Sequence, residues 1–409
     1  MLHRTIQLYR NSFGGLSKDI WLLALVTLIN RSGTMVIPFM TVYLTSQLHF
    51  SLGQAGWVMT CFGVGSVLGS LLGGKLTDTF GYYWVQFWAL LLSGAMFLVL
   101  MQVQSFGGMC GTIFLLSIVA DAFRPANHAS IAVYSKPENR TRSYSLIRLA
   151  INLGFSIGPA VGGFIAGAHG FKWLFLVDGL TCMSAALFLL FSLKQKQEPA
   201  NTSNTTPQAA VVTSAYHDRT FLWFALLTTI CGVVFMQLFS TLPVFYREGF
   251  GLSESQIGAL LALNGLMIAI LEMPFVYTLE RKAMRRLPLI GKGALLIGAS
   301  FFMLELSDFW GGVLILSVIT VTFGEMLTMP FSNVYALERS TPATRGQYMA
   351  VYSGTWSLAH ILAPALGMQI AQHWGFNTLW YVLTGLCIVA FLGYRLLEKR
   401  PAAIATQPG

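Results

Sequence analysis

The sequence predicts an all-α membrane protein with twelve transmembrane helices arranged as two pseudo-symmetric six-helix bundles. Three observations support this fold class. The chain of 409 residues is 55% hydrophobic and only 10% charged, whereas soluble domains carry roughly 25% charged residues. Apolar segments of about 20 residues, the length that crosses a bilayer, recur along the whole chain. The second half also repeats the first.

The repeat is visible at residues that shape helices. An offset of 205 positions relates Pro38 to Pro243, Pro125 to Pro330, Pro159 to Pro364, Arg140 to Arg345, and Gly162 to Gly367. A repeat of this length is half a fold rather than a solenoid unit, and parallel repeats around a central site build one large class of transporters. We therefore predict an N-terminal bundle at 1–193, a cytoplasmic linker at 194–218, a C-terminal bundle at 219–400 and a flexible tail at 401–409.

Hydropathy places six spans in each half. Those of the first half are 20–45, 53–76, 84–103, 108–134, 143–168 and 171–193. Those of the second half are 219–247, 254–279, 287–306, 309–336, 346–372 and 376–397. Several spans exceed 20 residues, so we expect tilting, or bending at Pro38, Pro125, Pro243 and Pro330.

The loop charges predict the topology. The odd-numbered connections hold only Lys172 and Arg247, whereas the termini and even-numbered connections hold all other lysines and arginines outside the spans. Basic loops stay in the cytoplasm, so we expect a multi-pass protein of the inner cell membrane with both termini cytoplasmic. The net charge of +9 then reflects topology rather than nucleic-acid binding. The five cysteines lie in apolar segments without CxxC spacing, and we interpret them as small hydrophobic residues that form neither disulfides nor metal sites.

Charged residues inside the spans predict the functional site. They are Arg31, Arg124, Arg148, Lys292, Asp121, Asp178, Glu272 and Glu325. A charge facing lipid costs roughly 2.5 to 3.5 kcal/mol, so these groups must pair, face the bundle interior or line a water-filled cavity. We predict that they line such a cavity.

Two motifs resemble signatures of the major facilitator superfamily. The segment Gly74-Lys-Leu-Thr-Asp78-Thr-Phe-Gly81 resembles its loop signature. The segment from Gly154 to Gly163, with Gly158, Pro159 and Gly162, resembles the antiporter signature of its drug:proton antiporter branch. Arg124 stands where that branch carries a membrane-buried arginine linked to proton coupling. The resemblance covers essentially the whole chain and implies a fold of twelve helices.

The resemblance also implies gates. Gly154, Gly158 and Gly162 share one helix face, and in the family this face packs against a helix of the other half and seals the outer side; ordinary small-residue packing is the alternative. Asp78 allows a tight cytoplasmic turn with its carboxylate near a helix N-terminus or a basic residue. Tyr82 and Tyr83 stand where the family has basic residues, so the usual charge relay is in doubt. Glu280 holds the corresponding position in the second half.

The acids are candidates for proton coupling. Asp121, Arg124 and His128 are spaced by three and four, so they share a helix face; they form either a coupling site or a structural ion pair. Alternative partners for the acid are Arg148 with Asn152, and Arg31 with Asn30.

Glu325, with no basic residue in its span, is the strongest single candidate. As an unpaired acid it would exchange a proton near neutral pH; its alternative is a protonated acid bonded to a neighbouring helix. Glu272 is either a coupling acid or the partner of a basic residue such as Lys292.

The resemblance implies that further residues line the substrate cavity. These are Tyr43, Tyr246, Met326, Trp356 and His360. Aromatic and thioether side chains accept varied lipophilic cations, although core packing explains each methionine equally well.

We predict a proton-coupled secondary transporter that exports small amphipathic or cationic compounds by proton antiport through alternating access. The alternative is a proton-coupled importer of a metabolite, peptide or siderophore, which the three arginines favour. An enzyme or a lipid-handling protein is a third class, but no HExxH motif and no phosphate loop occurs, and the GxSxG pattern at Gly154–Gly158 belongs to the segment that resembles the antiporter signature. We expect no cofactor and no metal, with protons as coupling ion. The expected partners are a small-molecule substrate and the bilayer, without nucleic acid, and we expect a monomer.

Overall fold

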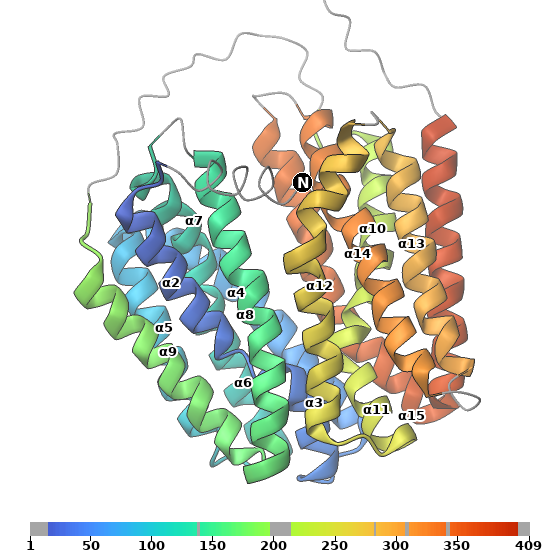
Figure 1. Ribbon diagram of the computed structural model, residues 1–409, viewed down its shortest axis with the longest axis horizontal. Coiled ribbons are helices and arrows are strands. Elements are labelled where there is room, and N and C mark those ends of the chain that lie inside the picture. The colour runs from blue at the N-terminus through green and yellow to red at the C-terminus, as the bar shows by residue number, and fades with distance from the viewer. Residues whose placement is uncertain are drawn as a thin grey trace, which may run out of the picture. The chain divides into compact units, whose positions relative to one another are not determined.

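The computed structural model describes residues 15–136, 140–196, 214–281, 284–306, 311–340 and 344–399. Within these ranges the chain is helical and contains no strand, which confirms the predicted fold class (Figure 1). Eleven segments of the described chain are long and apolar enough to cross a membrane. The last, Gln347–Lys399, contains Gly375 with a φ of 83°, and this non-helical residue separates the two spans expected there.

The first half contains eight described helices. They are α2 (Lys18–Ser32), α3 (Val36–Ser46), α4 (Leu52–Phe80), α5 (Tyr82–Leu100), α6 (Phe106–Asp121), α7 (Phe123–Tyr134), α8 (Arg140–His169) and α9 (Lys172–Ser192). The second half contains α10 (Arg219–Ser240), α11 (Leu242–Phe250), α12 (Glu254–Arg281), α13 (Arg286–Met303), the short 3₁₀ helix η2 (Leu304–Leu306), α14 (Gly312–Arg339) and α15 (Arg345–Lys399).

The chain divides into two compact units. The first contains α2 to α9 together with residues 243–269, which comprise most of α11 and the first part of α12. The second contains α10, the rest of α12 from Ile270, and α13 to α15. The predicted bundle limits at 193 and 219 stay a prediction. The tail at 401–409 and most of the linker lie outside the described residues.

Three of the four expected bends are interruptions of a helix. The regular helix is interrupted between α2 and α3, at Ala122 between α6 and α7, and at Thr241 between α10 and α11, although the backbones of Ala122 and Thr241 keep right-handed helical dihedral angles. Pro38, Pro125 and Pro243 lie in the first turn after each interruption. A proline is tolerated there because its missing N–H would have had no intrahelical partner. Pro330, in contrast, lies inside the continuous helix α14.

Matching caps start the second and eighth spans. Ser51 Oγ accepts a hydrogen bond from the Gln54 backbone N–H at 3.2 Å, and Gln54 Oε1 accepts one from the Ser51 N–H at 3.0 Å. Ser253 and Gln256 make the same reciprocal pair, at 3.3 and 2.9 Å. This capping box satisfies N–H groups that a helix start leaves unpaired.

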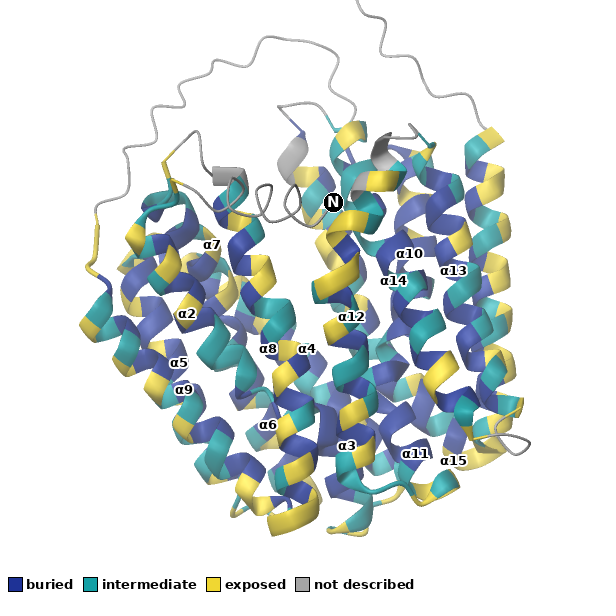
Figure 2. Cartoon of the chain, viewed as in Figure 1, coloured by how far each residue is buried: buried dark blue, intermediate teal, exposed yellow. Residues whose placement is uncertain are grey.

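Each unit has its own apolar core. That of the first unit includes Ile20, Phe123 and Leu189, and that of the second includes Phe224, Ile290 and Phe331. Figure 2 marks exposed residues in yellow along the helices, and many large apolar side chains are among the exposed residues. Phe191 is 82% exposed, which is unfavourable in water and favourable against lipid. The chain is therefore a multi-pass membrane protein.

Candidate functional site

The break in the first span is held by a buried acid of the sixth. Asp178 on α9 is fully buried. Its carboxylate accepts hydrogen bonds from the backbone N–H groups of Met35, at 3.0 Å to each oxygen, and of Val36, at 2.8 Å. These N–H groups begin α3 and have no intrahelical acceptor. Asp178 thus caps α3 from another helix, which leaves Asn30 and Arg31 at the end of α2.

An ion pair forms at the break between α6 and α7. Arg124 Nε lies 2.7 Å from Asp121 Oδ1, and the exposed fractions of the two side chains are 46% and 8%. The pairing expected from the spacing is therefore present, and only its acid is buried. The second carboxylate oxygen, Oδ2, is buried without a hydrogen-bond partner in the described chain, and so is Arg31 Nε. An unsatisfied buried polar group costs roughly 1 to 3 kcal/mol.

A small cavity lies beside the two residues that carry these unsatisfied atoms. Its volume is about 70 Å³, and both Arg31 and Asp121 line it. Asn30, Ser93 and Cys182 contribute further polar atoms. The cavity is large enough for water, and water needs two or more polar partners of this kind. The cavity can therefore hold a water molecule between Asp121 and Arg31.

Basic groups also lie on the surface of the first unit. Arg124 and His128 on α7 and Arg148 on α8 are exposed, and Asn152 is half-buried. The His128 ring lies 6.0 Å from that of Tyr144. Exposed cations in the middle of a span are costly against lipid, so this face is suited to water. The structure thus brings Asp121, Arg124, Arg31 and Asn30 together around or beside the cavity and places His128 on the exposed part of α7.

The glycine stripe of α8 packs against the first span of its own half. A Cβ atom built on Gly154 would lie 2.4 Å from Arg31 Cβ, one on Gly158 would lie 2.9 Å from Thr34 O, and one on Gly162 would lie 2.9 Å from Met35 Cβ. The expectation that this face meets a helix of the other half is therefore wrong. Its small residues allow α8 to approach the chain break beside Arg31.

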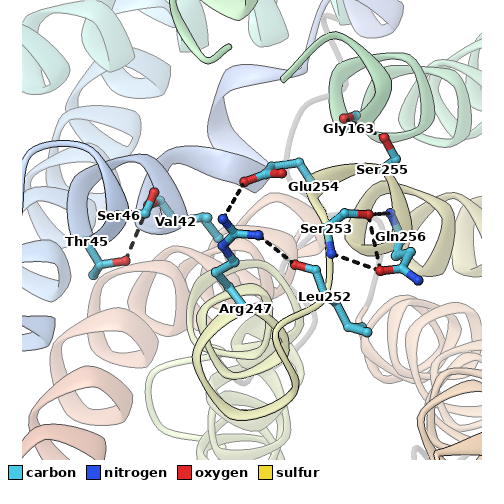
Figure 3. Close-up of polar contacts among 10 residues, drawn as sticks. All are labelled: Val42, Thr45, Ser46, Gly163, Arg247, Leu252, Ser253, Glu254, Ser255 and Gln256. Carbon is cyan, nitrogen blue, oxygen red and sulfur yellow. Dashed lines mark hydrogen bonds and ion pairs between the residues drawn. The ribbon is translucent and has the colours of Figure 1, made fainter. Parts of the chain in front are cut away.

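The neighbouring face of α8 meets the eighth span. A Cβ atom on Gly163 would lie 2.4 Å from Glu254 O, and one on Gly258 would lie 2.3 Å from Pro159 O. Ser255 Oγ donates to the Gly163 carbonyl at 3.2 Å (Figure 3). Gly163 and Pro159, rather than the stripe at 154, 158 and 162, hold the first part of α12. The segment from Gly154 to Gly163 therefore makes two contacts. One face of α8 packs against the first span, and the adjacent face packs against the first part of α12.

Figure 3 also shows the turn that leads from α11 into α12. Arg247 Nη1 donates to the Leu252 carbonyl at 3.1 Å, and its Nη2 lies 3.5 Å from Glu254 Oε1. Glu254 is the first residue of α12, where the helix dipole favours a negative charge. This ion pair and the Ser255 hydrogen bond both hold the first turn of α12.

The loop signature forms the turn between α4 and α5. Gly81 has a φ of 80°, a conformation that favours glycine. Gly74 has open space around its Cα, and Asp78 is exposed and forms no ion pair among the described residues. Tyr82 and Tyr83, which replace basic residues of the family pattern, instead anchor the end of α9 and the chain beyond it. Their hydroxyl groups donate to the carbonyls of Lys196 and Leu193, each at 3.2 Å.

The acids of the second unit are less isolated than expected. Glu325 on α14 is half-buried and has an interaction partner, so the expectation of an unpaired acid is wrong. Glu272 on α12 is buried and also has a partner, whereas Lys292 is exposed. Glu280 lies in α12, but its side chain lies outside the described residues.

The expected cavity wall is divided between core and surface. Tyr43 packs on Phe171 and Phe175, with ring centroids 5.7 and 5.1 Å away. Tyr246 and Met326 are likewise buried. Trp356 and His360 on α15 are half-buried, and the His360 ring lies 2.8 Å through Nδ1 from the Trp356 carbonyl. A role for these residues in substrate binding stays a prediction.

Sequence reasoning missed a polar cluster at the start of α10. Asp218 caps this helix by accepting from the Phe221 N–H at 3.1 Å, and it also binds Arg339 through two bonds of 2.5 and 2.9 Å and Tyr348 at 2.9 Å. Burial raises the pKa of Asp218, but these hydrogen bonds outweigh burial and the pKa is lowered overall. The only local signal was an aspartate before an apolar run.

Comparisons with known proteins match the whole chain. The family model described as Major Facilitator Superfamily matches residues 20–364 and 332–409. The Na(+), Li(+), K(+)/H(+) antiporter of Planococcus maritimus is 23% identical, with 92% of this chain and 95% of that protein covered. Multidrug resistance protein 2 of Bacillus subtilis is 24% identical, with 89% and 91% covered. A crystal structure of the peptide transporter POT in complex with sulfate has a TM-score of 0.80 at 16% identity, covering 94% and 95%.

Proposed function

Because this chain belongs to the major facilitator superfamily, whose members are transporters and not enzymes, we propose a specific transport reaction for it. It exports small amphipathic or cationic compounds in exchange for protons, by alternating access. The observation that carries this proposal is the buried carboxylate of Asp121, which has one oxygen on Arg124 and the other without a hydrogen-bond partner in the described chain, at a residue that lines a cavity together with Arg31.

The geometry gives Asp121 two alternative states. When ionised, it holds Arg124 through Oδ1 and offers a negative charge to a cation. When a proton reaches Oδ2 through the cavity, the carboxyl group becomes neutral and its hold on Arg124 weakens. Arg124 is always charged, so it then repels a bound cation. Proton and cation therefore compete for one site, which is the requirement for antiport.

The glycine signature supplies the mechanical part of the proposal. Gly154 contacts Arg31 directly, and Gly163 contacts the first part of α12. A change in the charge balance around Arg31 is therefore transmitted to α8 through packed atoms. The names of two relatives, a multidrug resistance protein and a cation/proton antiporter, are in keeping with an exported cation. Glu325 is proposed to bind the cation in the second unit.

Purified protein in liposomes with an imposed pH gradient tests the proposal, with tetraphenylphosphonium as the probe. We expect gradient-driven accumulation that a protonophore abolishes and that Asp121→Asn lowers at least about 100-fold, the size of a typical proton-transfer contribution. Glu338→Gln is the matched control, because Glu338 is an exposed acid paired with Arg286, and it should transport normally. Accumulation that ignores the protonophore, or a normal Asp121→Asn variant, would overturn the proposal.

A second candidate function is proton-coupled import of an anionic or zwitterionic ligand. Arg124 and Arg148 are exposed on the first unit, and cations of this kind bind carboxylates. The direction of flux in whole cells separates the two functions. Uptake of a labelled dipeptide without efflux of a cation would favour import. Energy-dependent exclusion of tetraphenylphosphonium from the cells would favour export.

A further inference from the structure

Helices α4 and α6 lie in backbone contact along a regular ladder that continues to the start of α7. A Cβ atom built on Gly65 would lie 2.5 Å from Phe114 O, one on Gly69 would lie 2.3 Å from Ile118 O, and one on Gly73 would lie 2.5 Å from Ala122 Cα. The glycines of α4 and the residues they contact both advance by four positions from one contact to the next. The two helices therefore run parallel with a fixed register. Small residues permit this close approach.

The next step of the ladder contains two cysteines. Cys61 precedes Gly65 by four residues, and Cys110 precedes Phe114 by four. Their side chains interact with one another, both are half-exposed, and both are free thiols. The other three cysteines, Cys182, Cys231 and Cys387, are buried. A disulfide needs Cα atoms about 4.4 to 6.8 Å apart with side chains facing each other, and the register of the two helices together with the contact between the two thiols places these side chains face to face.

We propose that Cys61 and Cys110 form a redox-active dithiol that closes into a disulfide between α4 and α6. The oxidant is a small-molecule disulfide. The Cys61 thiolate attacks it, releasing one small thiol and forming a mixed disulfide. The Cys110 thiol then loses its proton and displaces the second small thiol. Two protein thiols lose two protons and two electrons, and the small disulfide is reduced to two thiols. For these two cysteines, the interpretation as passive small residues is thereby replaced.

The predicted topology places Cys110 near the side of the membrane that faces away from the cytoplasm. Cys110 lies one turn from the start of α6, at the end of the helix that the loop charges predict to face away from the cytoplasm. Disulfides persist in oxidising compartments outside the cytoplasm. The bond would join two helices of the same compact unit, so it would tether that unit internally.

Intact-mass measurement tests the proposal on the full-length protein in detergent. The protein is incubated with oxidised glutathione, then denatured and alkylated with N-ethylmaleimide. Reduced protein should take up five adducts, one for each cysteine, and oxidised protein two fewer, while remaining monomeric on a non-reducing gel. Digestion without reductant should yield a linked peptide pair containing residues 61 and 110.

Two variants make the test specific. Cys61→Ser should take up an adduct at every remaining cysteine after oxidation. The double variant Cys110→Ala with Gly111→Cys moves the thiol by one position to a place where a Cβ atom has nothing within 4 Å, so it should fit without forming the bond. Five adducts on oxidised wild type, or equal loss of adducts in either variant, would overturn the proposal. Mixed disulfides with glutathione on both cysteines, without a linked peptide, would overturn it as well.

Discussion

The fourth and tenth spans occupy equivalent places in the repeat but carry different chemistry. Pro125 and Pro330 are 205 positions apart, and adding 205 to Asp121 and Arg124 gives Met326 and Met329. The ion pair of the fourth span therefore has two methionines as its counterpart. The fourth span is interrupted at Ala122, whereas α14 is continuous. The repeat thus preserves the residues that shape helices, while this Asp–Arg ion pair belongs to one copy.

The first and seventh spans show the same division. Both are interrupted before a proline, yet different groups stabilise the two interruptions. In the first span Asp178, a charged group from another helix, accepts the free N–H groups. In the seventh span Gln237, an amide of the same helix, accepts a hydrogen bond from the Thr241 hydroxyl and donates to the Ala363 carbonyl at 2.8 Å. The break is repeated, but the residues that stabilise it are specific to each half.

Substitution at the paired positions 124 and 329 tests this difference most strongly. Arg124→Gln removes the charge that holds Asp121, so gradient-driven accumulation of tetraphenylphosphonium should fall by at least about tenfold, equivalent to 1.4 kcal/mol. Met329→Gln makes the same side chain at the equivalent position of α14 and should stay within about twofold of wild type. If the two variants lose activity equally, the chemistry is shared between the copies.

The two helix breaks should differ in stability. Asp178→Ala leaves two buried N–H groups without an acceptor, at roughly 1 to 3 kcal/mol each, so thermal unfolding should shift down by several degrees. Gln237→Ala removes neutral hydrogen bonds worth roughly 0.5 to 1.5 kcal/mol each and should shift it less. The measurement is the unfolding temperature in one detergent. A larger shift for Gln237→Ala would reverse the comparison.

The contact between α8 and α12 should be sensitive to one methyl group. Gly163→Ala places a Cβ atom against the Glu254 carbonyl, and such overpacking typically costs about 1 to 3 kcal/mol. Gly111→Ala, where nothing lies within 4 Å, adds the same methyl group in the same unit. We expect only Gly163→Ala to lower stability and the transport rate. Equal behaviour of the two variants would show that α8 and α12 adjust freely.

The helix caps should respond differently to acid. Asp218 caps α10 with a charge, whereas Ser17 caps α2 with a neutral hydroxyl that accepts from the Ile20 N–H at 3.3 Å. Because the pKa of Asp218 is lowered by folding, its stabilisation is complete above the unfolded value of about 3.9. It is lost as pH falls through the lower folded value.

Unfolding temperatures measured between neutral pH and about pH 3 test the cap at Asp218. Asp218→Asn should therefore be less stable than wild type at neutral pH and should approach it in strong acid. Ser17→Ala should lower stability by an amount that does not change with pH. A pH-independent deficit in Asp218→Asn would show that its charge does not contribute.

The sequence determined whatever depends on composition and on neighbours along the chain. The apolar segments predicted the membrane class, because a bilayer is the solvent in which such surface is stable. The capping box of Ser51 and Gln54 is also local, because the two residues lie three positions apart. The spacing of Asp121 and Arg124 predicted their ion pair for the same reason. Each of these features rests on a local interaction.

Only the tertiary structure decided which distant groups meet. Asp178 binds the N–H of Met35 across 143 positions of the chain, and Asp218 binds Arg339 across 121. The glycines of α8 have the same spacing whether they face the first span or the eighth, so no periodicity could assign their partner. Such contacts depend on how helices are rotated and packed against one another to within a few tenths of an ångström, and that information is distributed over the whole chain.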